Sequence, residues 1–553
     1  MHRRRWVILG VLVVSLLVVV LDNTVLNVAL KVIADPQDGL GATQGELQWA
    51  INSYTLVFAG LLFTSGILGD RLGRKRLLIT GMIVFGLASL ASAYAQDPEQ
   101  LIAARALMGL GGAVVMPQTL SVISNVFTPA ERPRAIGIWA GAVGLGIAIG
   151  PTLGGLLLDH FWWGSVFLIN VPVVALGVTA MAIVAPESRD PKPGRLDPLG
   201  VLGSIVGLVL LTYGIISGGQ DGWLAPQVLG TIAAGLAVLA AFVWWESRID
   251  HPSLDVRLFR NPRMSAAVGL IGLTFFALSG VVFFLTFYWQ SVRGFTPFQA
   301  GLLVLPLAIT QVIVSPRSAG LVRRYGAKAV SVGGLALVAL ALSTYGWLVT
   351  AATPIWIILA FGVVQGAGMA VVMPAATESI MSTLPRERAG AGSAVQNTAR
   401  QTAVALGVAV IGSIVSTVYR SRIEGSLTGL PSGLRDLAGE SIESTMAVVA
   451  RLGHAGAPLV EPAKESFMSG MHVAGYLAGL FALLGLLVAA LWLPGRSAAG
   501  RPEDTTDPAD VPPERPARAG RTAPEAVATV AVDAAAPRGG ERRDGAYASG
   551  RSV

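Results

Sequence analysis

The sequence predicts an all-helical protein that crosses a membrane about fourteen times. Of its 553 residues, 53% are hydrophobic and only 13% are charged, and the mean hydropathy is +0.64. Since a soluble domain carries about a quarter charged residues, lipid must cover most of this chain. The apolar residues also fall into repeated runs of about 20, which is the length that spans a bilayer as a helix.

The long apolar runs, separated by polar turns, give the expected helices in chain order. The first run is not a cleaved signal peptide, because it is too long and continues into Asp22 and Asn27 without a clear cleavage site. The expected spans are 6–29, 46–68, 78–95, 101–124, 134–157, 163–185, 198–217, 226–246, 264–290, 297–318, 329–350, 354–376, 390–415 and 468–493.

Basic residues set the orientation of these spans. They gather in every second loop, and the intervening loops hold little beyond Lys31 and Arg293. Because cytoplasmic loops carry the excess of Lys and Arg, the sequence predicts an even number of helices with both chain ends in the cytoplasm. The inner basic residues are Arg71, Arg74, Lys75, Arg76, Arg132, Arg134, Arg189, Lys192, Arg195, Arg248, Arg257, Arg260, Arg263, Arg323, Arg324, Lys328, Arg386 and Arg388.

An internal repeat predicts two related halves. The segment at 109–117 (GLGGAVVMP) recurs at 366–374 (GAGMAVVMP) with seven of nine positions identical. Repeated halves are typical of transporter folds, in which the substrate site lies between them near the middle of the membrane. Chance similarity of two Gly/Ala-rich helices is the alternative.

The repeat fixes the expected organisation of the chain. Apolar residues in the outer loop, Leu434, Leu437, Ile442, Met446 and Val449, predict short amphipathic helices on the membrane surface. The expected parts are an N-terminal six-helix bundle at 1–190, an inserted helix pair at 191–250, a C-terminal six-helix bundle at 251–495 with a long outer loop at 416–467, and a disordered cytoplasmic tail at 496–553.

Asp22 is the leading candidate for a functional residue. It lies inside an otherwise apolar helix, where a carboxylate persists only if it faces a cavity, a partner or a proton. Burial and a nearby cation act in opposite directions on its proton affinity, so the group could load and release protons. A static hydrogen bond between helices, aided by Asn23 or Asn27, is the alternative.

Arg105 is the expected partner of Asp22. At 1.5 Å per residue, Asp22 lies about 12 Å and Arg105 about 6 Å from the outer ends of their helices, a difference that an arginine side chain spans. Protonation of Asp22 would then release Arg105, an event that can bias a two-state carrier. Alternatively, Arg105 extends to the outer headgroups.

Polar residues in the apolar spans predict a substrate cavity. On the span at 390–415, five of them fall on one helical face and must meet protein or water. Substrate contact and contact between helices remain equally open for this face, which consists of Ser393, Gln396, Asn397, Arg400 and Gln401. The expected cavity residues are Asn23, Asn27, Gln311, Gln396, Asn397 and Arg400.

Two further segments are candidates for conformational roles. The short basic turn at 66–76 must lie at the cytoplasmic surface, but Asp70 is unnecessary for orientation and predicts a latch with an arginine or a helix N-terminus. In the span at 134–157, Pro151 predicts a bend in the helix. The glycines of this span predict close packing against another helix; either packing is their only role, or the segment also acts as a hinge. The candidate latch residues are Gly66, Asp70, Arg71, Gly73, Arg74 and Lys75, and the candidate bend residues are Gly146, Gly150, Pro151, Gly154 and Gly155.

Enzyme chemistry is not expected. The chain has no cysteine, which excludes disulfides and thiolate sites, and it has no Walker motif for ATP. The basic residues that give the net charge of +7 sit in loops without a nucleic-acid-binding motif. We therefore expect no catalytic residue, no metal and no cofactor. The five histidines lack metal-ligand spacing and are His2, His160, His251, His454 and His472.

Four segments together resemble the fourteen-helix drug:proton antiporter family of the major facilitator superfamily, especially actinobacterial multidrug and antibiotic exporters. The resemblance covers about residues 6–493. It is carried by 21–30 (LDNTVLNVAL), by 66–76 (GILGDRLGRKR), by Arg105 with Gly109 and Gly112, and by Gly146, Gly150, Pro151, Gly154 and Gly155.

The resemblance implies a major facilitator fold and export driven by the proton gradient through alternating access. It assigns proton coupling to Asp22 and Arg105, gating to Asp70 with its basic neighbours, and bending to Pro151. Two departures stand out. Lys31 replaces the proline that usually ends the first motif, and Arg323 stands where the second copy of the turn would have its acid.

The resemblance gives the substrate class less directly. Relatives that export divalent organic cations tend to carry an acid in the tenth helix, whereas 297–314 holds only Gln311. We therefore expect neutral, weakly acidic or monovalent amphipathic compounds. The expected partners are this substrate, protons and the bilayer of a bacterial inner membrane, with the protein as a monomer. An exporter of a lipid, siderophore or osmolyte and a non-transporting membrane sensor are the alternatives.

Overall fold

The computed structural model describes residues 4–128, 131–189, 196–250, 252, 254–384 and 389–493, and these residues form helices and no strands. The predicted tail at 496–553 lies outside the described residues, as do the basic residues Lys192, Arg195, Arg386 and Arg388.

Seven helices make up the first part of the chain. Local signals fix their ends, since the Thr43 side chain and Glu46 form a reciprocal cap at the start of α2, and Asp97 caps α4 just before a proline. The helices are α1 (Arg5–Ala34), α2 (Gln44–Leu72), α3 (Arg74–Ala93), α4 (Pro98–Val126), α5 (Arg132–His160), α6 (Ser165–Leu168) and α7 (Asn170–Val184).

The rest of the described chain continues with helices only. α10 ends in a short π-helical segment, η2, and three 3-10 segments join other helices. The elements are α8 (Pro198–Asp221), α9 (Pro226–Arg248), η1 (Val256–Arg260), α10 (Pro262–Phe287), η2 (Tyr288–Val292), α11 (Pro297–Leu302), α12 (Leu305–Tyr325), α13 (Ala327–Leu348), α14 (Ile355–Met381), α15 (Ala389–Ile423), η4 (Glu424–Leu427), α16 (Ser432–Ala438), α17 (Ile442–Leu452), η5 (Gly453–Leu459) and α18 (Val460–Trp492).

The predicted number of spans is confirmed. Thirteen helical stretches among the described residues are long and apolar enough to cross a membrane, and the fourteenth is α2, which is bent by 56° between Leu62 and Thr64. Each corresponds in order to one expected span. The chain is therefore a multi-pass membrane protein.

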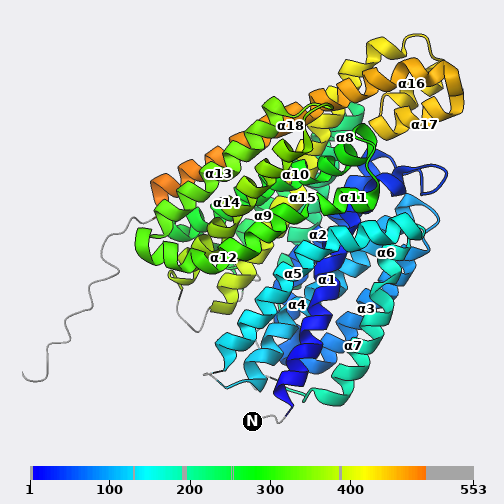
Figure 1. The fold of residues 1–553 in the computed structure, drawn as a ribbon. Helices are drawn as coiled ribbons and strands as arrows, with labels where there is room; N and C mark the ends of the chain where they lie inside the picture. Colours follow the sequence, from blue (N-terminus) through cyan, green and yellow to red (C-terminus); the bar gives the residue numbers. More distant parts are fainter. Residues whose placement is uncertain are drawn as a thin grey trace, which may run out of the picture. The chain divides into compact units, whose positions relative to one another are not determined.

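The predicted outer loop at 416–467 is shorter than expected, because α15 continues to Ile423 and α18 begins at Val460. The predicted short helices are present as α16 and α17, which lie at the end of the structure opposite the N-terminus (Figure 1). Their predicted contact with the membrane surface is wrong for the apolar face: Ile442 is 1% exposed and packs with its neighbours into the main core. Protein rather than lipid covers this face.

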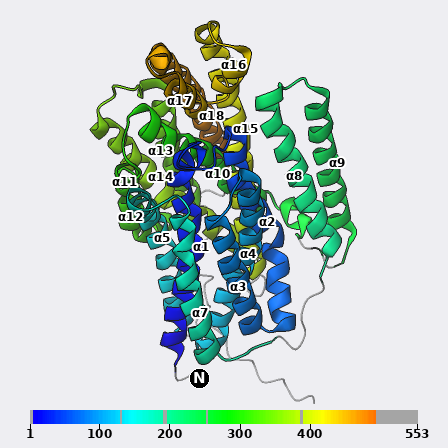
Figure 2. The ribbon, with the colours of Figure 1, turned by 90° about the vertical axis from the view of Figure 1, so that its right-hand side faces the viewer.

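The inserted helices form a pair of their own. α8 and α9 pack against each other, and α8 also contacts α2 and α15. In Figure 2 the pair stands beside α2, on the side away from α5. The bundle boundaries proposed from the repeat remain a prediction.

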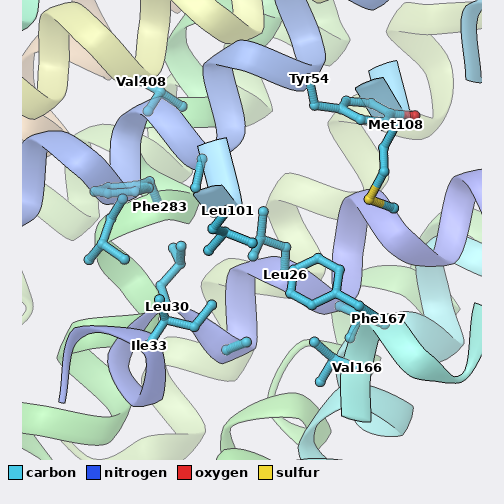
Figure 3. Packing of buried hydrophobic residues seen from close by; sticks show 14 of the residues in the cluster. Leu26, Leu30, Ile33, Tyr54, Leu101, Met108, Val166, Phe167, Phe283 and Val408 are labelled. Carbon is cyan, nitrogen blue, oxygen red and sulfur yellow. The ribbon is translucent and has the colours of Figure 1, made fainter. Parts of the chain in front are cut away.

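One apolar core joins the first and second parts of the chain. Figure 3 shows Leu26 and Leu30 of α1 near Leu101 of α4 and Phe283 of α10, in a cluster that also includes Tyr54 of α2 and Val408 of α15. Figure 3 also includes Ile33, Met108, Val166 and Phe167. The functional candidates in α1 and α4 are therefore held in a close-packed interior.

The internal repeat has a packing explanation. A Cβ atom on Gly109 would collide with the backbone of Tyr54 in α2, and one on Gly366 would lie 2.5 Å from the carbonyl oxygen of Leu307 in α12. The same glycine therefore lets α4 approach α2 and lets α14 approach α12. The repeated segment therefore makes the same kind of helix–helix contact in both halves, α4 with α2 and α14 with α12.

Candidate functional site

The structure brings Asp22 of α1 and Arg105 of α4 together as a buried ion pair. Asp22 is 2% exposed and Arg105 is 1% exposed. The other carboxylate oxygen accepts a hydrogen bond from Asn170 of α7 at 3.5 Å, and the Nε of Arg105 donates to the carbonyl of Ala50 at 3.1 Å. Such a pair survives burial because its remaining polar atoms also find partners.

Aromatic rings and a second polar layer enclose the pair. The guanidinium carbon of Arg105 lies 4.5 Å from the centroid of the Tyr54 ring and 5.9 Å from that of Phe167. The Tyr54 hydroxyl accepts a hydrogen bond from Asn23 at 3.0 Å, and Asn170 donates to Ser89 at 3.1 Å. Cation–π contact strengthens where water is excluded.

Sequence reasoning missed Tyr54 and Asn170. Each carried a signal, because Asn170 is a single polar residue in the apolar stretch 166–178, and Tyr54 belongs to the polar run at 52–55 inside an otherwise apolar span. In a membrane helix such residues face protein or water.

The remaining cavity candidates lie on three helices, α1, α12 and α15. On α1, Asn27 donates to the backbone oxygen of Asn23 at 3.2 Å. On α15, Gln396 donates to Thr377 of α14 at 2.9 Å, whereas Asn397 donates to its own helix at Ser393. Gln396 therefore makes a contact between helices, which was one of the two alternatives for the polar face of α15.

Arg400 is the most unusual residue of the α15 face. Its guanidinium carbon lies 5.6 Å from the ring centroid of Phe275, and its buried Nε has no hydrogen-bond partner among the described residues. Gln311 is half-buried in α12, and its side chain forms no hydrogen bond with any described residue.

The cytoplasmic turn between α2 and α3 contacts the end of α7 and the segment that follows it. Gly73 joins α2 to α3 with a φ of +108°, which other residues rarely adopt, and Arg74 pairs with Asp70 at 2.8 Å. The backbone N–H of Lys75 donates to Glu187 at 3.1 Å, and its Nζ donates to a carbonyl of α7. Asp70 thus meets an arginine as predicted, while Glu187 is a partner that sequence reasoning missed.

The other turn residues differ in their surroundings. A Cβ on Gly66 would meet nothing within 4 Å, so no packing in this conformation requires a glycine there. Arg71 is exposed.

On the same cytoplasmic side, Arg5 pairs with Glu131 at 2.8 Å, and this hydrogen bond lowers the pKa of the Glu131 carboxyl below its usual value.

The glycines of α5 lie against two different helices, α1 and α11. Cβ atoms on Gly146 and Gly154 would crowd Val20 and Val25 of α1, and one on Gly150 would collide with Thr24. A Cβ on Gly155 would instead collide with the backbone at 297–298, in α11 of the second half. The close packing predicted for this segment is present, whereas α5 runs without interruption through Pro151 and its bend remains a prediction.

Hydrogen bonds join the two halves at the end that the charge rule places outside. The Nζ of Lys31 donates to the carbonyl of Gln290 at 3.0 Å, and Thr286 donates to the carbonyl of Asn27 at 2.7 Å. Asp159 at the end of α5 accepts from Thr296 at the start of α11, at 2.9 Å. Lys31, the departure from the usual first-helix motif, therefore helps to close the outer side.

No group of histidine, cysteine, aspartate and glutamate side chains among the described residues could hold a metal ion. The polar groups brought together here suit proton and small-molecule binding within a membrane.

The family model described as Major Facilitator Superfamily matches residues 12–408. The multidrug efflux pump LfrA of Mycolicibacterium smegmatis is 36% identical over 494 residues, which cover 88% of this chain and 95% of that protein.

The methyl viologen resistance protein SmvA of Salmonella typhimurium is 34% identical over 499 residues, covering 88% of this chain and 98% of that protein. A crystal structure of a bacterial homolog to the human lysosomal transporter Spinster superposes with a TM-score of 0.63 at 17% identity. That match covers 89% of this chain and 98% of the other, and it supports the fold alone.

Proposed function

Because the chain belongs to the Major Facilitator Superfamily, we propose that it exports hydrophobic or amphipathic compounds, drugs and antibiotics among them, across the inner membrane of a bacterium in exchange for protons. It is a transporter and not an enzyme. The observation that carries the proposal is the buried Asp22–Arg105 pair, which places an ionisable carboxylate among polar partners inside a membrane bundle.

The family relationship supports the export direction. The relatives similar to this chain over nearly their whole lengths are named for multidrug efflux and for resistance to methyl viologen. The energy source is the proton gradient, and the cycle requires no cofactor. The working unit is a monomer.

The ion pair supplies the coupling step. A proton that binds Asp22 neutralises its carboxylate, and Arg105 loses its charged partner. The guanidinium then remains in contact with the ring of Tyr54. Protonation in the first half thus changes the charge that faces the substrate path, and so biases the two-state carrier.

The hydrogen bonds at the outer end favour a state that is closed to the outside and receives cargo from the cytoplasm. Opening outward must break the contacts of Lys31 with Gln290 and of Asp159 with Thr296, and must separate Gly155 from α11. At the cytoplasmic turn, Asp70 and Arg74 hold α2 and α3 together and form the first half's side of the gate.

The substrate path carries polar rather than acidic groups. Asn23, Asn27, Gln396, Asn397, Gln311 and Arg400 are its proposed lining. This set favours neutral, weakly acidic or monovalent compounds, because Arg400 repels multiple positive charge. The name of SmvA points the other way, since methyl viologen is a dication.

Transport in proteoliposomes tests the proposal. The purified protein is reconstituted, a pH gradient is imposed, and movement of rhodamine 6G, a monovalent lipophilic dye, is followed by fluorescence. We expect transport against the dye gradient that stops when a protonophore collapses the pH difference, and weaker competition from methyl viologen than from monovalent dyes. Dye movement indifferent to the pH gradient would contradict proton coupling, and methyl viologen as the stronger competitor would overturn the substrate class.

A second role is the export of another cargo, such as a lipid, siderophore or osmolyte. Competition against rhodamine 6G in everted vesicles separates these cargoes. A membrane sensor that moves nothing would not need the buried charge pair, and it predicts no substrate-dependent proton flux in the same vesicles.

A further inference from the structure

A cavity of about 390 Å³ lies among α10, α15 and α18, away from the ion pair. Side chains of Leu254 and Phe259, from the connection between α9 and α10, line its cytoplasmic end. Its walls are apolar apart from Thr398 and Thr402, and its volume suits a small ligand. The wall residues include Gly269, Gly272, Phe276, Ala399 and Phe481.

Glycines in α10 create this space. A Cβ atom on Gly269 or Gly272 would meet nothing within 4 Å, so neither glycine is needed for helix packing. By contrast, Gly280 of the same helix lies directly against Ile411 of α15. The two glycines therefore leave room that the packing of the helices does not require.

A smaller cavity of about 180 Å³ continues the space toward the inserted helix pair. It shares Leu254, Thr398 and Thr402 with the first cavity and is otherwise lined by α2, α8 and α9, for example by Phe242. The two cavities together run from α18 past α15 to the inserted helices. An elongated apolar ligand fits this course better than a compact one.

Measured along α10, the cavity extends from near the cytoplasmic end to about the middle of the helix. Gly269 and Phe276 lie seven and fourteen residues from the start of α10 at Pro262, or about 10 and 21 Å along its axis. Near the inner end of α9, Trp244 is 58% exposed, as is typical of tryptophan at the lipid headgroup level.

Basic residues flank, in the chain, the residues that line the cytoplasmic end of the cavity. Arg260 follows the cavity residue Phe259 directly, and Arg263 lies in the first turn of α10. Both are exposed, and neither forms a salt bridge with any residue that the structure describes. Arg257 is exposed as well, although it donates to the backbone at Ser247. Arginines at this level attract the phosphate of anionic lipids.

We propose that this cavity binds an anionic phospholipid of the inner leaflet, with an acyl chain between α10 and α15 and the phosphate on Arg260 and Arg263. The apolar walls suit the acyl chain, and the exposed arginines that follow Phe259 in the sequence suit the negative headgroup. The bound lipid fills the gap between the inserted pair and the second half. The site is separate from the proton-coupling pair and does not depend on the proposed export function.

Native mass spectrometry of the full-length protein in detergent tests the site, with dioleoylphosphatidylglycerol and dioleoylphosphatidylcholine as probes. We expect the anionic lipid to bind the wild type about tenfold more tightly than the zwitterionic one. Gly272→Leu, which fills the cavity, lowers affinity for both lipids. Arg260→Gln with Arg263→Gln removes the preference for the anionic lipid but keeps binding of the chain.

Gly230→Leu in α9 is the matched control, since a Cβ there also meets nothing within 4 Å but the residue lies outside both cavities. It should bind both lipids as the wild type does. Unchanged affinity in Gly272→Leu, or equal binding of the two lipids by the wild type, would overturn the proposal. Displacement of the lipid by rhodamine 6G in the wild type would also overturn it, because the cavity would then be a substrate entrance. If Gly272→Leu fails to fold, the double arginine variant alone decides.

Discussion

Tyr54 lies directly against Arg105, with the guanidinium carbon 4.5 Å from the ring centroid, while its hydroxyl accepts a hydrogen bond from Asn23 at 3.0 Å. One side chain thus joins the cation of the ion pair to a polar residue of α1 that is proposed to line the substrate path. The ring is fully buried, so its face shields the pair from water.

Two substitutions separate the roles of this ring and its hydroxyl. Tyr54→Phe keeps the contact with Arg105 and loses one hydrogen bond, so we expect a stability loss of about 1 kcal/mol and retained transport. Tyr54→Ala removes the ring and should cost about 3–5 kcal/mol, with transport lost. Thermal unfolding in detergent and dye transport measure the two effects. Equal behaviour of both variants would contradict a role for the ring face.

Gly155 tests the contact between the halves at the outer end. Gly155→Ala places a methyl group against the backbone of α11, so it should weaken the closed outer side. Because the chain has no cysteine, Ala300→Cys provides a single buried reporter at this contact, where the native alanine is 4% exposed. We expect faster maleimide labelling of this cysteine in the Gly155→Ala background.

Gly144→Ala is the matched control for that experiment. It adds the same methyl group to the same helix, but at a position where a Cβ meets nothing within 4 Å. Its labelling rate should equal that of the parent. Equal acceleration by both substitutions would point to a general effect of alanine in α5 instead of separation of the halves.

Glu440, between α16 and α17, predicts a pH dependence of the outer helices. Burial raises the pKa of its carboxyl above the usual 4.5, Glu46 and Asp436 add to the rise, and Arg420 opposes it. The packed state therefore takes up a proton more readily than the open state, so packing of these helices strengthens as pH falls through the raised pKa and is weakest above it.

Hydrogen–deuterium exchange over residues 432–452 measures this dependence. After correction for the intrinsic exchange rate, protection should be greater at about pH 5 than at about pH 8. Glu440→Gln cannot ionise, so it should reduce the difference between the two conditions. A wild type better protected at high pH would contradict the sign.

Much of this structure could be predicted from the sequence, because membrane helices depend on long apolar runs and on charge distribution. The fourteen spans and the pairing of Asp22 with Arg105 followed from run length and helix depth alone. The π-helical end of α10 and the packing of α17 onto the core did not, since both depend on contacts between segments far apart in the chain.

The partners of the site were harder to predict than its charges. Asn170 and Glu187 come from segments that pack beside α1 and α3 only after the bundle has formed. Gln311 was grouped with Arg400 on polarity alone, and the structure joins them by no hydrogen bond among the described residues. A lone polar residue in an apolar span marks a contact, but its partner is a property of the fold.

Asp22→Asn provides the most direct test of the central claim. The amide has nearly the same shape as the carboxyl group but cannot ionise, so it removes the proton-binding function and leaves the packing largely intact. Asp38→Asn, the same change at an exposed position near the outer end of α1, is the control. Both variants are reconstituted in parallel with the wild type, at protein amounts matched by gel filtration.

The measurement is rhodamine 6G transport driven by an imposed pH gradient in proteoliposomes. We predict that Asp22→Asn falls to the rate of protein-free vesicles, while Asp38→Asn and the wild type transport the dye equally. Full gradient-driven transport by Asp22→Asn would contradict the account and leave the buried pair with a packing role only.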